Sequence, residues 1–419
     1  MLFLAESFHP VLGGGEAHLR RLGSALVACG DAATVVTRRG EPSWPATDEL
    51  DGVRVRRVPP TGAGRVGKYL MLPGALLAVA REAGRHDVLV VRGSRVLGLP
   101  ALVAGRLAGL PVVLQPEING ELDGSAFTWG KGWALGGRGR LARAVVRSRN
   151  VFLRDAEAFV AMSSRIRDEM RGAGIAAERI ALIRHGVDTV RFRPATREEA
   201  EALRARLGLP RETLAVYTGR LLEGKGLDVL LDAFTAVAAG DAALQLVLVG
   251  SGEGQSLSVE EALRRRAAET GLAGRVRFAG RVEAVEDWLR AADLFVFPSL
   301  FEGLGISLVE AAACGLPAIG SRTGGIVDVI EDGRSGLLVG PGDVAGLAGA
   351  LRSLAADAGL RSELGRRARA VARERFDEAD ALARYRALFL EVSSRWPSSR
   401  PARAPRAGAG PLPSRGARA

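Results

Sequence analysis

The sequence predicts an α/β protein of two doubly wound domains, each with a parallel sheet covered by helices. Short, continuous apolar runs alternate with amphipathic stretches of helical spacing along most of the chain, as in strand-helix-strand units. Glycine-rich turns join several of these runs to the helix that follows. The length of 419 residues, with 47% apolar and 25% charged residues, is sufficient for two domains with full cores.

Composition excludes several classes of protein. The two cysteines, Cys29 and Cys314, lie far apart and lack metal-ligand spacing, so neither a disulfide framework nor a zinc site is expected. No secretory apolar segment follows Met1. The most apolar long stretch, Val96 to Leu114, is interrupted by Arg106, prolines and glycines, which disfavours a membrane span. We therefore expect a cytoplasmic protein.

The net charge of +11 is concentrated in two segments. Lys131 to Arg149 and Ser394 to Ala419 each hold six basic residues and no acid, and subtracting both from +11 leaves −1 for the rest of the chain. The Pro, Arg, Ala and Gly content of the second segment predicts a disordered tail. Because no aromatic platform accompanies this tail, we expect no nucleic-acid partner.

The first half of the chain begins with a strand at Leu2 to Ala5. A glycine loop with Gly13 and Gly14 follows, and then a helix that Glu16 opens. Further strands are expected at Ala32–Thr37, Val53–Val58, Asp87–Val91, Pro111–Leu114 and Ala158–Met162, with a helix at Pro100–Ala108. Gln115 and Glu117 come directly after one of these strands, where α/β folds place their ligands.

A basic amphipathic helix is predicted from Arg140 to Ala156. Arginines occupy one face and apolar residues another, and Trp129 and Trp133 lie just upstream. One interpretation is peripheral contact with an anionic membrane through residues 129–154, at the inner face of the plasma membrane. The other is a domain helix with a solvated basic face.

The second domain opens after a charged linker at Phe192 to Pro210. A strand ends at a turn containing Gly219, and a helix with an apolar inner face follows. Arg220 and Lys225 flank the start of this helix. Two cations beside a helix N-terminus suit a diphosphate, one through a bidentate fork and the other as a movable point charge.

The stretch from Pro298 to Gly325 combines a strand end, a glycine loop and a helix start. Gly303 and Gly305 leave the backbone bare where the first amides of a helix point outward, which favours a phosphate. Glu302 in the loop and Glu310 on the helix are eight residues apart. Their carboxylates are acceptors for hydroxyl groups, so a sugar nucleotide offers the matching ligand.

This stretch resembles the Glu-x7-Glu signature of retaining GT-B glycosyltransferases of family 4, the glycosyltransferase group 1 type. The resemblance extends as an ordered series of motifs over most of residues 1–390. It implies two Rossmann-like domains facing across a cleft, with acceptor bound mainly by the first and nucleotide sugar by the second. The expected divisions are 1–190 for the N-terminal domain, 195–365 for the C-terminal domain, 366–393 for a terminal helix crossing back, and 394–419 for the tail.

The resemblance also implies roles for particular residues. Arg220 and Lys225 match the pair that holds the donor diphosphate, and Glu302 orients the sugar, so these three form the catalytic set. Many relatives carry a histidine near Gln115, and this chain has none there. The remaining expected contacts are Gly13, Gly14, Gly219, Gly303, Leu304, Gly305 and Glu310 for the donor, and Glu16, Gln115 and Glu117 for the acceptor.

The implied reaction moves a hexose from a UDP- or GDP-sugar to an acceptor hydroxyl with retention. The chain contains no Asp-x-Asp motif, so we expect neither a metal nor another cofactor. Lipid-linked, polysaccharide and small-molecule acceptors all stay open.

Alternatives are a phosphorylase or epimerase of the same architecture, and a non-catalytic basic protein that binds nucleic acid or membrane. A nicotinamide oxidoreductase is disfavoured, because the loop at Leu244–Gly254 lacks the acidic residue expected about 20 positions on.

Overall fold

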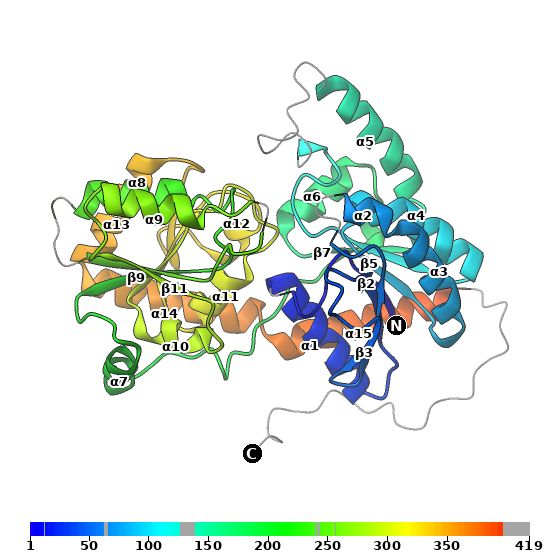
Figure 1. Cartoon of the computed structure of the whole chain (residues 1–419), viewed down its shortest axis with the longest axis horizontal. Coiled ribbons are helices and arrows are strands. Elements are labelled where there is room, and N and C mark those ends of the chain that lie inside the picture. Colours follow the sequence, from blue (N-terminus) through cyan, green and yellow to red (C-terminus); the bar gives the residue numbers. More distant parts are fainter. Residues whose placement is uncertain are drawn as a thin grey trace. The chain divides into compact units, whose positions relative to one another are not determined.

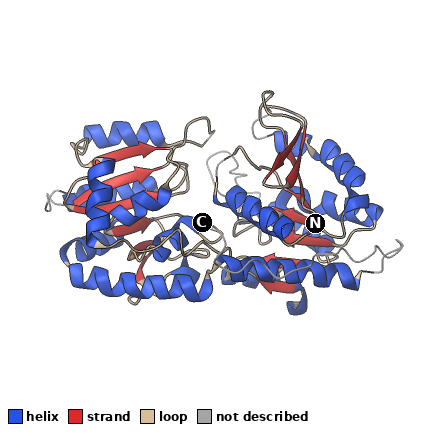
Figure 2. Cartoon of the chain, turned by 90° about the horizontal axis from the view of Figure 1, so that it is seen from below, coloured by secondary structure: helices blue, strands red, loops and turns tan. Residues whose placement is uncertain are grey.

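The computed structural model describes residues 1–11, 13–62, 66–125, 139–238, 240, 244–255 and 257–396, with backbone alone for 139–143. The chain divides into two compact units (Figure 1). Unit 1 comprises Met1–Arg184 and the chain from Ala379 on, and unit 2 comprises His185–Glu378. In each unit, helices cover a sheet, as the view coloured by secondary structure shows (Figure 2).

The sheet of unit 1 has the strand order β3-β4-β2-β1-β5-β6-β7-β8. Every neighbouring pair is parallel except β3 with β4, which pair antiparallel at the edge. The strands are β1 (Leu2–Leu4), β2 (Thr34–Arg38), β3 (Thr47–Leu50), β4 (Val53–Val58), β5 (Leu89–Arg92), β6 (Val112–Gln115), β7 (Ala158–Ala161) and β8 (Ile180–Leu182).

The helices of unit 1 form a layer on each side of this sheet. Because parallel crossovers are right-handed, the connection from β1 to β2 places α1 on one face, while the connections from β4 to β7 place α3, α4 and α5 on the other. The helices are α1 (Gly14–Ala28), α2 (Gly67–Leu70), α3 (Leu72–Glu82), α4 (Ser94–Ala108), α5 (Gly139–Leu153), α6 (Ser164–Gly172) and α15 (Glu378–Arg395).

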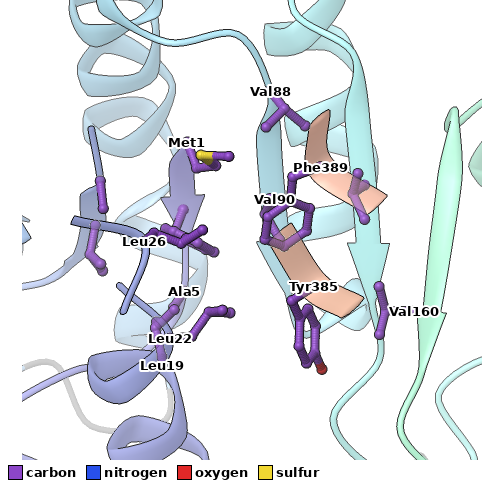
Figure 3. Close-up of a cluster of buried hydrophobic side chains, with 14 of the residues drawn as sticks. Met1, Ala5, Leu19, Leu22, Leu26, Val88, Val90, Val160, Tyr385 and Phe389 are labelled. Atoms are coloured by element: carbon purple, nitrogen blue, oxygen red, sulfur yellow. The ribbon is translucent and has the colours of Figure 1, made fainter. Parts of the chain in front are cut away.

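The C-terminal helix α15 completes the core of unit 1. Tyr385 and Phe389 are fully buried, and Figure 3 shows both rings beside Val90 and Val160 of the sheet. The Phe389 ring also meets Phe3 edge-on, with centroids 6.0 Å apart. A strand near the start of the chain and a helix near its end thus share one apolar core.

Unit 2 contains an all-parallel sheet with the order β11-β10-β9-β12-β13-β14. The strands are β9 (Thr213–Thr218), β10 (Leu244–Val249), β11 (Val276–Gly280), β12 (Leu294–Phe297), β13 (Ala318–Ser321) and β14 (Gly336–Val339). The helices are α7 (Arg197–Leu207), α8 (Leu227–Ala238), α9 (Glu260–Glu269), α10 (Val285–Ala291), α11 (Ile306–Ala313), α12 (Ile326–Val329), α13 (Val344–Ala356) and α14 (Ala358–Arg375).

The structure differs from the expected single terminal helix over 366–393. Two helices occupy this region, α14 in unit 2 and α15, with a break at Phe376 and Asp377. The break forms because the backbone pairs with Val187 instead of continuing the helix. The Val187 amide donates to the Phe376 carbonyl at 2.9 Å, and the Glu378 amide donates to the Val187 carbonyl at 3.2 Å.

Two further features depart from the expectations. The contact boundary falls at Arg184 and His185, and the expected linker at 192–210 lies in unit 2 and contains α7. Arg369 of α14 holds that segment by donating to the Phe192 carbonyl at 2.8 Å. The edge strand β3 was not expected, because its Thr-Asp-Glu-Leu sequence has no apolar run.

The packing of α15 yields a stability prediction. Phe389→Ala removes a fully buried ring, so we expect the free energy of unfolding in urea to fall by about 3–5 kcal/mol. The neighbouring Leu390 is 42% exposed, and Leu390→Ala should change the free energy of unfolding by less than about 1 kcal/mol. Circular dichroism of the full chain in urea measures both, and equal losses would contradict the assigned packing.

Candidate active site

The strongest candidate site lies at the carboxyl ends of two neighbouring strands of unit 2, β9 and β12. Strand β12 pairs with β9 through Phe295 and Val216, so the loops that follow the two strands begin side by side. Open α/β sheets bind ligands at this edge. All the predicted site residues from Gly219 to Glu310 lie on these two loops or on helix α11.

Bare backbone brings the two loops together. Gly226 has φ +65, and a Cβ added there would lie 2.1 Å from the Pro298 carbonyl oxygen. The Leu300 amide donates to the Gly224 carbonyl at 2.9 Å. Gly250 approaches Gly219 in a similar way, because a Cβ added at Gly250 would lie 1.9 Å from the Gly219 carbonyl oxygen. Side chains at Gly226 or Gly250 would force the loops apart.

Lys225 and Glu302 form an ion pair across these loops. Lys225 Nζ lies 2.7 Å from Glu302 Oε2, and the two side chains are 22% and 16% exposed. The other carboxylate oxygen of Glu302 accepts the Gly303 amide at 3.2 Å. The Lys225 ammonium also lies 5.8 Å from the centre of the Phe297 ring. Lys225 has three donors, so it can hold Glu302 and bind an anion as well.

Arg220 provides a second, more accessible cation. Its side chain is exposed, and its guanidinium makes no hydrogen bond or ion pair with the described residues. Buried Tyr217 donates its hydroxyl proton to the Arg220 carbonyl at 3.1 Å. Burial raises the pKa of Tyr217, the charge of Glu302 raises this pKa further, and the charge of Arg220 lowers it.

The start of helix α11 requires glycine. Gly305 caps the helix with φ +90, and an added Cβ would lie 2.9 Å from the Phe297 ring. Its carbonyl accepts the amides of Leu308 and Val309. The amides at the start of such a helix have no acceptor one turn earlier and attract anions. Leu304 is buried between the two glycines, so its backbone rather than its side chain faces any ligand.

Glu310 lies half-buried on α11, near a cation that the sequence did not single out. Arg191 makes a bidentate ion pair with Glu286, with both distances 2.9 Å. The bond to Glu286 raises the pKa of Arg191, burial lowers this pKa, and the charge of Glu310 raises it. Burial raises the pKa of Glu286, but the bond from Arg191, a backbone hydrogen bond and the charges of Arg191 and Arg290 together lower it below its usual value.

The remaining predicted residues belong to unit 1. Gly13 caps helix α1 in extended conformation, and its carbonyl accepts the Ala17 amide at 2.9 Å. Gly14 is the first residue of the helix. Glu16 lies in the first turn, where the Ser7 hydroxyl donates to its carboxylate at 2.6 Å. These residues sit at the carboxyl end of β1, as the sequence predicted.

The structure does not support acceptor contact through Gln115. Its side chain is 1% exposed and donates to the Tyr385 hydroxyl of α15 at 3.0 Å, so it is part of the core. Glu117 is the accessible residue, with 44% of its side chain exposed and Oε1 3.2 Å from Arg92 Nε. Arg92 is buried and also donates to the Gly15 carbonyl at 2.9 Å, so it ties Glu117 to the start of α1.

Sequence reasoning missed the groups that fix the Glu117 loop. Glu121 accepts the Ser94 amide and hydroxyl, both at 2.8 Å, with one oxygen, and the Glu117 amide at 2.9 Å with the other. Glu169 of α6 accepts the amides of Gly120 and Leu122. The sequence carries no local signal for these bonds, because Glu169 is 47 residues from Leu122.

Buried hydroxyls near the Lys225 pair were also missed. Thr218, the last residue of β9, and Ser299, just after β12, are 3% and 0% exposed, and neither hydroxyl has a hydrogen-bond partner among the described residues. The sequence signal that could have identified Thr218 and Ser299 was their position at or just after the end of a strand.

Other predictions fall partly outside the described residues. Trp129, Trp133 and residues 397–419 are not described, nor are the side chains of Arg140 and Arg143. In the described part of the chain, no helix is both long and apolar enough to cross a membrane. The same part shows no group of three or more His, Cys, Asp or Glu side chains placed to hold a metal ion.

Two glycosyltransferase family models match the chain, one in each half. The family model for glycosyl transferases group 1 matches residues 212–357, and that for a glycosyl transferase 4-like domain matches residues 13–186. D-inositol 3-phosphate glycosyltransferase 1 of Catenulispora acidiphila is 31% identical over 363 residues, which cover 82% of this chain and 84% of the relative. The enzyme of the same name from Xylanimonas cellulosilytica is 30% identical and covers 92% and 93%.

Solved structures show the same fold. Sucrose-phosphate synthase from Thermosynechococcus elongatus has a TM-score of 0.80 at 24% identity, covering 94% of this chain and 99% of that one. Anabaena HepE, solved in complex with UDP and glucose, has a TM-score of 0.74 at 23% identity, covering 93% and 98%. The glycosyltransferase WaaG has a TM-score of 0.70 at 18% identity, covering 94% and 99%.

Fold and site together define a glycosyltransferase of the GT-B class. Within that class, the chain belongs to glycosyltransferase family 4, the group 1 glycosyl transferases. The family expected from the Glu-x7-Glu stretch is therefore confirmed.

The different surroundings of the two cations lead to a testable contrast. Lys225→Met leaves the mostly buried Glu302 carboxylate without its partner, and we expect a loss of about 1–3 kcal/mol in unfolding free energy without ligand. Arg220→Gln removes an exposed side chain and should change the unfolding free energy by less than about 0.5 kcal/mol. Urea unfolding of both variants tests this, and a fully stable Lys225→Met variant would contradict it.

Proposed function

We propose that this enzyme transfers a hexose from a UDP- or GDP-sugar to an acceptor hydroxyl with retention and without a metal ion. The observation that carries the proposal is the Lys225–Glu302 pair, which joins the loop that also carries Arg220 to the loop that leads into the glycine start of α11. It puts two cations and outward-facing amides beside a carboxylate, which is the chemistry that a nucleotide sugar requires.

The two cations suit the leaving nucleoside diphosphate. Breaking the anomeric bond places negative charge on the phosphate oxygens, and catalysis depends on stabilising that charge. The Arg220 guanidinium offers a bidentate fork, and the Lys225 ammonium a compact charge already held by Glu302. Together with the amides at the start of α11, these groups supply the charge that a divalent ion provides elsewhere, which supports metal-independent transfer.

The carboxylates take the hydroxyl groups of the donor. Glu302 in the loop orients the transferred sugar, while Glu310, on the second turn of α11, binds the ribose. Neither acts as a nucleophile in this proposal. The leaving phosphate takes the acceptor proton on the same face of the sugar, so the anomeric configuration is retained.

Two comparisons guide the choice of first substrates. The HepE structure contains UDP and glucose, so UDP-glucose is the first donor to test. The curated relatives are called D-inositol 3-phosphate glycosyltransferases, so this inositol phosphate is the first acceptor. In unit 1, Glu117 and Glu16 provide acceptors for its hydroxyls, and lipid-linked and glycan acceptors form the second panel.

Donor binding is the first prediction of this proposal. In buffer with a chelator, one nucleotide sugar should raise the melting temperature and give a calorimetric Kd, because a ligand that binds only the folded state stabilises it. Glu310→Gln should weaken that affinity about tenfold or more, through loss of a charged hydrogen bond.

Glu269→Gln, an exposed site on α9, is the matched control and should bind like wild type. If no UDP-, GDP- or ADP-sugar binds with or without magnesium, the donor site is wrong and a phosphorylase or epimerase becomes the better interpretation.

Stereochemistry is a separate prediction. With donor and acceptor present, proton NMR should show a product with the anomeric configuration of the donor sugar, and nucleoside diphosphate should be released only when acceptor is added. An inverted product would overturn retention while leaving the donor site intact. Nucleotide release without acceptor would indicate hydrolysis instead of transfer.

A further inference from the structure

The outer face of the helices α3, α4 and α5 carries an unusual set of exposed apolar side chains. Helix α4 packs against both α3 and α5, so the three form one continuous layer over the sheet of unit 1 (Figure 1). Leu107 on α4 is 86% exposed, more than any other large apolar side chain in the described part of the chain. The exposed apolar side chains of this outer face are Leu77, Val103, Leu107, Val145, Val151 and Phe152.

An ion pair brings two of these helices together at the most exposed point. Arg106 of α4 lies 2.8 Å from Asp155, which is two residues beyond the end of α5. Leu107 is the next residue after Arg106, and Phe152 is three residues before Asp155. Leu107 and Phe152 therefore flank the same contact between α4 and α5.

The charge of this outer face is mainly positive. Helices α4 and α5 contain no acidic residue, and the only acid of α3, Glu82, is fully buried. Arg81, Arg106 and Arg147 are exposed. Asp155, beyond the end of α5, is 49% exposed but paired with Arg106, so arginine is the predominant charge beside the apolar groups of this face.

We propose that this outer face binds the surface of an anionic lipid bilayer. Leu107 and Phe152 enter the boundary between headgroups and acyl chains, and Arg81 and Arg147 meet the anionic headgroups. Apolar side chains framed mainly by arginine match such a surface, since insertion and electrostatic attraction act together. The proposal concerns unit 1 and does not depend on the transfer reaction. The membrane contact considered in the sequence analysis was residues 129–154. The proposed face keeps the described part of α5 from that segment and adds α3 and α4.

The test measures sedimentation of the full chain with vesicles of phosphatidylglycerol and phosphatidylcholine, and with phosphatidylcholine alone. We expect binding to the anionic vesicles that weakens with salt. Leu107→Gln with Phe152→Gln should weaken it about tenfold or more, because less apolar surface is buried. Arg81→Gln with Arg147→Gln should weaken it about fivefold per charge and reduce the salt dependence.

Val190→Gln with Leu390→Gln is the matched control, because both residues are exposed apolar side chains away from this face. Its vesicle affinity should equal that of wild type, and circular dichroism and melting temperature should show that every variant folds. Equal binding by all three pairs would overturn the proposal and place the contact elsewhere, including the basic C-terminal segment.

Failure of wild type to bind anionic vesicles at low salt would also overturn it. If Leu107→Gln with Phe152→Gln instead abolishes self-association in light scattering and vesicles do not bind, a second copy covers the face.

Discussion

The close contact of two backbone segments in unit 2 is the constraint on which the candidate site depends. Gly226 leaves no side chain between its own loop and the Pro298 carbonyl, and that approach brings Lys225 within 2.7 Å of Glu302. The pair is mostly buried, so each charge needs the other. The left-handed conformation of Gly305 then starts α11 directly behind Glu302. A few glycines thus place the Lys225–Glu302 pair beside the start of α11.

The sequence carried enough information to predict these local features. Strand ends, glycine turns and the spacing of Glu302 and Glu310 are properties of contiguous residues, and in the structure the two loops follow neighbouring strands. The expected strand Val53–Val58 was confirmed residue for residue. Continuous or alternating apolar runs identify such strands because one or both faces are buried.

Features that depend on distant residues could not be predicted in this way. Gln115 stands at a strand end, where a ligand contact was the natural expectation, but its partner is Tyr385, 270 residues later. Arg191 is placed near Glu310 by its bond to Glu286, 95 residues away. The break between α14 and α15 depends on pairing with Val187. Helical spacing continues through that break, so it contains no local warning.

The return of α15 to unit 1 has a consequence for synthesis on the ribosome. All of unit 2 is inserted in the chain between the body of unit 1 and the helix that supplies Tyr385 and Phe389. During translation, the sheet of unit 1 is complete long before these rings exist, so part of its apolar face lacks its cover. Unit 2 has all its own residues before α15 is made. The second half of the chain can therefore reach its native packing first, and the earliest residues are among the last to be fully enclosed.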